Sequence, residues 1–436
     1  MRKSSIRPRA RAIAWMLTLV YFASYFTRIN FNVMIVKICS DLGVLDSEIA
    51  IVITALTISY GAGQVINGLL GDKIKPQWML TGGLALAIAS NVAMFFAQPI
   101  LPMAVIWCIN GFAHSMLWPP IVRLMSVYLT DDEYSYSAVR VSWGSSFATI
   151  ALYLLCPLLL NLFTWRQIIL ICAAVALLIL IAWQIMQGRL FTEPMAPDGK
   201  KKLAGSGVPQ KLPKYVFFAL SMIMLGIILQ GALRDGVTDW MPSVMKEKFG
   251  ISEENAIFTA VIPAIFSVIS FMAFDFLHRK LLRNEVTCAS VIFIGAAVSS
   301  LLLLVSDLWF PNPVFTILLI AIIIACMHGI NLMLITVVPK RFVKTGKVST
   351  VSGILNACTY IGASVAIPLF AILQETFETW TAAFIAWTVI ALLGVTVCGI
   401  VAPIWKKFRR EYADTAEEMP NVAASATESQ ETKQEA

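Results

Sequence analysis

Two arginines lie inside long apolar stretches of the chain: Arg28 in YFASYFTRINFNV and Arg234 in LQGALRDGVTDWMP. A charged side chain at the centre of a bilayer costs about 2.5 to 3.5 kcal/mol even on the lenient insertion scale, so such residues usually serve a function. Each guanidinium offers planar, bidentate hydrogen bonding, which suits a phosphate or carboxylate better than a cation or a neutral sugar. The pair therefore predicts a site for a small anion within a membrane.

The alternative is that each arginine is neutralised by a buried acid and only holds helices together. Arg234 has Asp235 and Asp239 beside it, whereas Arg28 has no acid in its own stretch. Asp235 is a candidate to tether Arg234 until a ligand arrives, or to titrate if transport is coupled to protons. We favour anion binding for the pair, and the salt-bridge alternative stays open for Arg234.

The composition requires lipid around most of the chain. Of the residues, 58% are hydrophobic and 14% charged, with a mean hydropathy of +0.78, whereas about 25% of a soluble domain is charged. The sequence predicts an all-α membrane protein with 12 transmembrane helices of about 20 residues each. We expect spans near residues 13–36, 50–70, 79–97, 102–128, 138–162, 166–187, 215–241, 255–277, 286–305, 314–338, 349–373 and 380–403.

The basic residues predict the orientation of these spans. Of the 33 Lys and Arg residues, 27 fall on the side that holds both termini and 4 on the other, and Arg28 and Arg234 are the remaining two. The positive-inside rule then places both termini in the cytoplasm and the chain in the cytoplasmic (inner) membrane. The net charge of +7 thus reflects topology, and no nucleic-acid partner is expected.

The two halves of the chain resemble each other. Arg28 and Arg234 lie 206 residues apart, and Asp72 and Asp275 lie 203 apart, each just past an even-numbered span. Such a parallel repeat is typical of carriers whose two bundles rock about a site at the bilayer midplane. We predict an N-terminal six-helix bundle (1–187), a cytoplasmic linker (188–214), a C-terminal six-helix bundle (215–403) and a disordered cytoplasmic tail (404–436).

Four sequence elements carry a resemblance to a known family: YFTRINF, GFAHSMLWPPIVR, LRDGVTDWMPSVMKE and VVPKRFVKTGKVSTVSG. They resemble the organophosphate:phosphate antiporters of the major facilitator superfamily, which include the glycerol-3-phosphate and hexose-6-phosphate carriers. The resemblance implies the major facilitator fold, alternating access and inorganic phosphate as counter-substrate. It also implies that Arg28 and Arg234 hold the substrate phosphate.

Two positions depart from that family. Ser145 stands where the glycerol-phosphate carrier has a substrate-contacting histidine, and Gln64 stands where the phosphate carriers commonly have a lysine. Both changes remove potential positive charge from the cavity. A monoanion such as a carboxylated sugar is therefore an open alternative to a dianionic phosphoester.

Other residues in the spans are candidates for substrate binding, each weighed against simple packing or interhelical hydrogen bonding. The full predicted binding set is Arg28, Arg234, Tyr25, Asn30, Tyr60, Gln64, His114, Trp118, Ser145, Asp239, Trp240, His328 and Tyr360. A histidine there can relay a proton or bind substrate, or it can be satisfied against a neighbouring helix. At the cytoplasmic span ends, Asp72, Lys73, Asp275 and Arg279 are predicted to form a charge latch between the halves, with topology anchoring as the alternative.

The predicted function is secondary active transport of a small organic anion, with an organophosphate exchanged for inorganic phosphate as the favoured form. The alternatives are proton-coupled symport of a sugar acid or similar carboxylate, and a membrane sensor that binds a phosphosugar. An enzyme is not expected, because the chain has no nucleophile–base arrangement, metal-ligand spacing or nucleotide loop. We accordingly expect no cofactor, no metal and no catalytic residue, and a monomer in the lipid bilayer.

Overall fold

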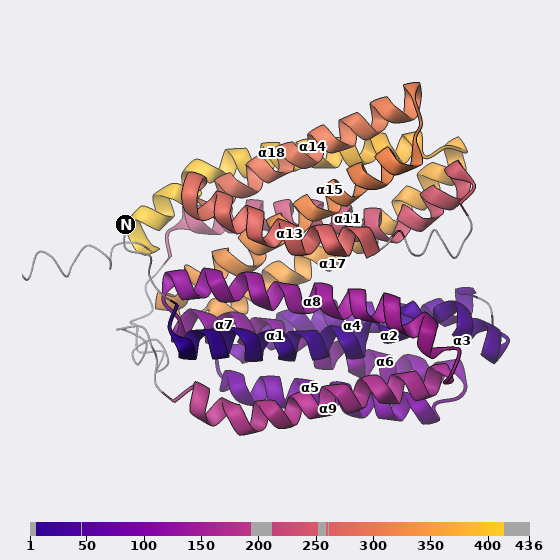
Figure 1. The fold of residues 1–436 in the computed structure, drawn as a ribbon. Helices are drawn as coiled ribbons and strands as arrows, with labels where there is room; N and C mark the ends of the chain where they lie inside the picture. The colour runs from indigo at the N-terminus through magenta and orange to yellow at the C-terminus, as the bar shows by residue number, and fades with distance from the viewer. Residues whose placement is uncertain (1–5, 45, 193–211, 252–258, 260, 414–436) are drawn as a thin grey trace, which may run out of the picture.

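The computed structural model describes residues 6–44, 46–192, 212–251, 259 and 261–413, and the chain there is almost entirely helical (Figure 1). The helices fall into two groups that lie side by side in the figure. The first group comprises α1 (Pro8–Arg28), α2 (Asn30–Val33), α3 (Ile35–Leu42), α4 (Asp46–Gly71), α5 (Pro76–Phe96), α6 (Ile100–Ser115), α7 (Trp118–Tyr128), α8 (Asp131–Leu159) and α9 (Trp165–Leu190).

The second group follows the linker. It comprises α11 (Lys214–Phe249), α13 (Val261–Leu277), the π-helical turn η1 (His278–Leu282), α14 (Glu285–Trp309), α15 (Pro313–Asn331), the π-helical turn η2 (Leu332–Val337), α16 (Val338–Lys340), the 3₁₀ turn η3 (Val343–Thr345), α17 (Val348–Phe377), α18 (Thr381–Phe408) and the π-helical turn η4 (Arg409–Ala413).

Within the described residues, eleven helices are long and apolar enough to cross a membrane. The segment that begins with α1 is not one of them, because arginines near both ends and several hydroxyl and aromatic side chains lower its mean hydropathy. It nevertheless packs along α8 and α9 as the twelfth long helix. The all-α membrane architecture predicted from the sequence is confirmed.

Two of the predicted spans are broken helices. The predicted span 13–36 is divided into α1, α2 and α3, with interruptions at Ile29 and Met34. The predicted span 102–128 is divided into α6 and α7 just before Pro119 and Pro120. Proline lacks the N–H that a continuous helix needs, which accounts for the second break. The first break contains neither proline nor glycine and has another cause, described below.

Side-chain caps fix several helix ends. Thr130 and Glu133 form a capping box at the start of α8, and Asn284 accepts from the first amides of α14. Such caps satisfy N–H groups that have no partner within the helix. They begin the helices close to where the apolar stretches predict them.

The boundaries of the predicted linker and tail differ in part from the structure. α9 runs on to Leu190, and residues 193–211 of the predicted linker lie outside the described residues. Residues 404–413 of the predicted tail are helical, because α18 continues into η4, where Arg409 Nη1 donates to Glu285 Oε2 at 3.0 Å. Residues 414–436 lie outside the described part of the chain.

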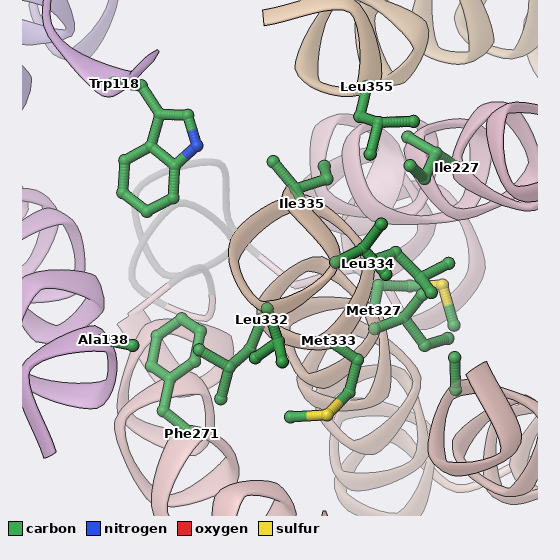
Figure 2. Close-up of a cluster of buried hydrophobic side chains, with 14 of the residues drawn as sticks. Trp118, Ala138, Ile227, Phe271, Met327, Leu332, Met333, Leu334, Ile335 and Leu355 are labelled. Atoms are coloured by element: carbon green, nitrogen blue, oxygen red, sulfur yellow. The ribbon is translucent and has the colours of Figure 1, made fainter. Parts of the chain in front are cut away.

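The two groups contact each other mainly through α4 and α7 against α17 and through α8 against α13. The α4–α17 contact depends on glycine, because a Cβ at Gly353 would lie 2.3 Å from the carbonyl oxygen of Gln64. One cluster of buried hydrophobic residues draws on both groups. Figure 2 shows Ala138 of α8 beside Phe271 of α13 and Leu332 of η2.

Candidate functional site

A cavity of about 340 Å³ lies between the two groups of helices. Residues of α1, α2, α4, α7 and α8 line it from the first group, and residues of α11, α13, α15 and α17 line it from the second. Nine of the residues predicted for substrate binding line this one cavity: Tyr25, Arg28, Tyr60, Trp118, Ser145, Arg234, Asp239, His328 and Tyr360. The two arginines, one from each group, therefore share a single chamber.

Arg28 is the last residue of α1, and it reaches the cavity between aromatic rings. Its guanidinium carbon lies 4.2 Å from the centre of the Tyr25 ring and 4.9 Å from that of Tyr60. These distances are in the range of cation–π attraction. Among the described residues, Arg28 forms no ion pair with a carboxylate, so its charge is available to a ligand.

Arg234 lies within the continuous helix α11 and is paired with its neighbour. Its Nε and Nη2 donate to the two carboxylate oxygens of Asp235 at 2.6 and 2.9 Å. The side chains of both residues keep contact with open space, at 14% and 26% of their full exposure. The pair is thus accessible from the cavity, and an incoming anion can compete with Asp235 for the guanidinium.

The charges that line the cavity are formally balanced. Arg28 and Arg234 are matched by Asp235 and Asp239, and His328 is the histidine of the lining. The Asp239 side chain is exposed to this space, and the described residues give it no hydrogen bond or ion pair. His328 Nδ1 lies 3.1 Å from Ser267 Oγ and 2.9 Å from the carbonyl oxygen of Ile324.

Four predicted binding residues lie outside the cavity lining. Asn30 is buried against Asn91, and the His114 Nδ1 atom pairs with Ser24 Oγ at 3.1 Å. Trp240 donates from Nε1 to the carbonyl oxygen of Ile367. The Gln64 amide is fully buried beside the α4–α17 contact, and neither of its polar atoms has a hydrogen-bond partner among the described residues.

Several residues of the lining were not predicted. Ser142, Ser146, Thr149 and Tyr153 line the cavity from α8 together with Ser145. Their spacing of three, four and seven residues places them on one helix face, so this polar stripe in an apolar span was a usable signal. The lining also includes Tyr21, Thr238 and Phe271, which no motif singles out.

The residues of the predicted latch lie at the end of the bundle where α1 begins and α18 finishes, here called the termini end (Figure 1). Asp72, just past α4, accepts from the backbone N–H groups of Ser349 and Thr350 at 2.8 and 3.0 Å. It also accepts from Thr350 Oγ1 at 2.5 Å. Asp72 therefore caps α17 from the other group of helices, and a carboxylate at this position is favoured by the helix dipole.

The second half of the predicted latch is arranged differently. Asp275 pairs with Arg279 of its own group at 2.9 Å. The contact of Arg279 with Asp132 of the other group is longer, at 3.8 Å. Lys73 is exposed. Stronger links across the groups are the Lys340–Asp131 ion pair and the bond from Tyr134 Oη to the Thr336 carbonyl at 2.5 Å.

Comparison with known proteins shows what this chain is similar to. Residues 17–367 match the Major Facilitator Superfamily. A "Probable hexose phosphate transport protein" of Chlamydia trachomatis is 28% identical over 137 residues, which span 31% of this chain and 29% of that protein. The match to that relative thus covers less than a third of its length. The glycerol-3-phosphate transporter of Bacillus subtilis is 24% identical over 375 residues, 79% of this chain and 81% of the relative.

A solved structure shares the fold. The proton:xylose symporter XylE, crystallised with 6-bromo-6-deoxy-D-glucose, superimposes with a TM-score of 0.73 at 12% identity over 92% of this chain and 95% of its own. The resemblance to organophosphate carriers that the motifs indicate is confirmed by the relatives, and the major facilitator fold by the family match and the superposition. The chain belongs to the Major Facilitator Superfamily and is a multi-pass membrane protein.

Proposed function

We propose that this transporter carries a small organic anion, held between Arg28 and Arg234, and that it exchanges an organophosphate for inorganic phosphate. The observation that carries the proposal is the position of the two guanidiniums. Both line one cavity between the two groups of helices, and Arg28 has no carboxylate partner among the described residues. The glycerol-3-phosphate transporter of Bacillus subtilis, similar over most of both chains, supports a phosphoester as cargo.

The proposed mechanism is alternating access. The anion binds Arg28 and displaces Asp235 from Arg234, so that both guanidiniums hold the anion and the two groups can rock about it. An empty cavity leaves Arg28 without a carboxylate partner among the described residues, in a low-dielectric region, which disfavours reorientation without cargo. This favours exchange over net transport.

The proposal includes an orientation. Most of the basic residues fall on the side of the termini end, which supports a cytoplasmic position for this end at the inner membrane. The bonds of Asp72 to α17 and of Lys340 to Asp131 would then close the cytoplasmic end in this conformation.

A second candidate is proton-coupled symport of a carboxylate such as a sugar acid. The specific observation is the pair of aspartates in the cavity. Asp235 occupies one guanidinium and Asp239 has no partner among the described residues, so only one arginine is free for a monoanion. A carboxylate in such a place is a candidate proton carrier.

Uptake into proteoliposomes tests both candidates. The panel contains glycerol 3-phosphate, hexose phosphates and hexuronates, with vesicles loaded with inorganic phosphate or prepared empty with an imposed pH gradient. We expect phosphoester uptake that requires internal phosphate. Uptake of a hexuronate that follows the pH gradient alone selects the second candidate, and tight binding of a phosphosugar without movement of label indicates a sensor.

Substitutions tie the result to the site. Arg28→Lys and Arg234→Lys are each expected to abolish uptake, because an ammonium cannot reproduce the forked geometry. The matched control is Arg166→Lys. Arg166 donates to the carbonyl oxygens of Phe95 and Ala97 at 2.9 and 3.0 Å and does not line the cavity, so its variant should keep the wild-type KM. Uptake that survives in both Arg28→Lys and Arg234→Lys contradicts the proposal.

A further inference from the structure

The first helix breaks immediately after Arg28. α1 ends at Arg28 and α2 begins at Asn30. In a continuous helix the N–H of Phe31 would donate to the carbonyl of Thr27, four residues earlier. Here the Phe31 N–H instead donates to the side-chain oxygen of Asn30 at 2.8 Å. The Thr27 carbonyl is thereby released from its helical partner.

Two asparagines of other helices take up the released carbonyl. Asn91 of α5 donates from Nδ2 to Thr27 O at 2.8 Å, and Asn110 of α6 donates to the same oxygen at 3.4 Å. Asn91 also accepts from Asn30 Nδ2 at 2.8 Å. The three residues Asn30, Asn91 and Asn110, here called the asparagine cluster, are fully buried. Together they satisfy both backbone groups that the break sets free.

The break is costly without this cluster. A buried backbone group with no partner costs several kcal/mol where no water is present, so irregular backbone at membrane depth is tolerated only where other groups satisfy it. Neither proline nor glycine occurs at the break to impose it. The cluster is therefore what stabilises this interruption against a continuous helix.

A simpler explanation of the Asn91 and Asn110 bonds is that they only hold helices together. The first group of helices contains an example of such a bond. Asn67 of α4 is buried and donates from Nδ2 to Ser115 Oγ of α6 at 2.7 Å. That bond joins two side chains and ends on no backbone atom of either helix. The bonds of Asn91 and Asn110 differ because they end on the backbone of the residue next to Arg28.

We propose that Asn91 and Asn110 are positioning residues for Arg28. By holding the break, they fix where the last residue of α1 projects, so that its guanidinium lies between Tyr25 and Tyr60 in the cavity. Neither asparagine lines the cavity, so they act on the bound anion only through Arg28. This inference rests on the proposed anion-binding role of Arg28.

The test compares Asn91→Leu, which keeps the shape of the side chain and removes its hydrogen bonds, with the matched control Asn67→Leu. Amide hydrogen exchange by mass spectrometry over residues 26–34 reports the break directly and needs no substrate. We expect faster exchange there in Asn91→Leu and no change in Asn67→Leu. Unchanged exchange in Asn91→Leu overturns the proposal.

Uptake kinetics test the consequence for the anion. We expect Asn91→Leu to raise KM about tenfold, the loss of roughly one hydrogen bond's contribution, with kcat within about twofold of wild type. Asn110→Leu, which removes the longer bond, should raise KM less and serves if Asn91→Leu does not fold. Equal increases in KM in Asn67→Leu and Asn91→Leu would show that both asparagines only hold helices together, and this result would overturn the proposal. A wild-type protein that moves no anion would instead refute the proposed function, while the exchange result would still stand.

Discussion

Arg28 and Arg234 occupy corresponding places in the two halves of the chain, yet the helices present them differently. Arg28 ends a broken helix whose interruption is satisfied by asparagines from α5 and α6, and it faces tyrosine rings. Arg234 lies inside the continuous helix α11, and two nitrogen atoms of its guanidinium donate to Asp235. The first half thus offers a free cation, and the second offers an ion pair.

The difference assigns the two arginines different tasks in the proposed cycle. Arg28 is ready to attract an anion as soon as the cavity is open. Arg234 must exchange Asp235 for the anion, so its contribution is the difference between two charge-assisted pairs. The two positions should therefore respond differently when their surroundings are changed.

The largest expected effect comes from removing the guanidiniums. Arg28→Ala and Arg234→Ala should each lower kcat/KM about 100-fold or more, since each removes charge-assisted hydrogen bonds to the anion. Adding Asp235→Ala should recover about tenfold in the Arg28→Ala background, where it frees the remaining Arg234, and more, about 30-fold, in the Arg234→Ala background, where it removes a carboxylate left uncompensated. Uptake is measured in the two single arginine variants and in the same two variants with Asp235→Ala added. Equal recovery in both backgrounds would remove the distinction between the two arginines.

A single change at Asp235 sharpens the comparison. Asp235→Asn frees Arg234 without altering its position, so KM for a phosphoester should fall about tenfold, the value of one charge-assisted bond that no longer has to be displaced. Concentration-dependent uptake measures it. A rise in KM would mean that Asp235 supports the bound state and does not compete with the anion.

The two aspartates at the termini end repeat the contrast between the halves. Asp72 caps α17 across the interface, whereas Asp275 pairs with Arg279 of its own group, which approaches Asp132 of the other group at 3.8 Å. Asp72→Ala should speed labelling of a cysteine placed at the buried Ser352 about fivefold, because losing a helix cap costs about 1 kcal/mol. The paired control, Asp132→Ala, removes a surface contact and should change labelling less than about twofold. Equal rates in the two variants would place the closure elsewhere.

The smallest effect is expected at Asp239. This carboxylate lines the cavity and pairs with no described residue, so Asp239→Asn removes only a nearby negative charge and should lower KM for the anion about threefold. Uptake is measured with internal phosphate and, separately, with an imposed pH gradient. Loss of uptake driven by the pH gradient would favour the proton-coupled candidate over exchange.

Much of the architecture follows from the sequence, because apolar length, basic loops and internal repeat are direct consequences of spanning a bilayer. The same physical cost that excludes charge from lipid singles out Arg28 and Arg234. Pro119 and Pro120 lie where α7 begins, at a break that proline chemistry predicts. These features depend on local amino-acid composition, which is known directly from the sequence.

Other features depend on how helices are rotated and packed, and periodicity alone does not set those. The break after Arg28 contains no proline or glycine, and it exists because asparagines 64 and 83 residues beyond Thr27 satisfy the Thr27 carbonyl. Gln64 is one helical turn from the cavity-lining Tyr60 but is buried against α17. The choice of Asp235, and not Asp239, as partner of Arg234 is likewise set by geometry in three dimensions.

Equilibrium binding to the purified protein tests the central claim most directly, since it needs neither turnover nor coupling. The radiolabelled anion that gives the highest uptake in the panel is titrated onto wild type, Arg28→Lys and the control Arg166→Lys. The account predicts saturable binding to wild type and Arg166→Lys and its loss in Arg28→Lys. Unchanged affinity in Arg28→Lys would show that the anion is held elsewhere and would contradict the account.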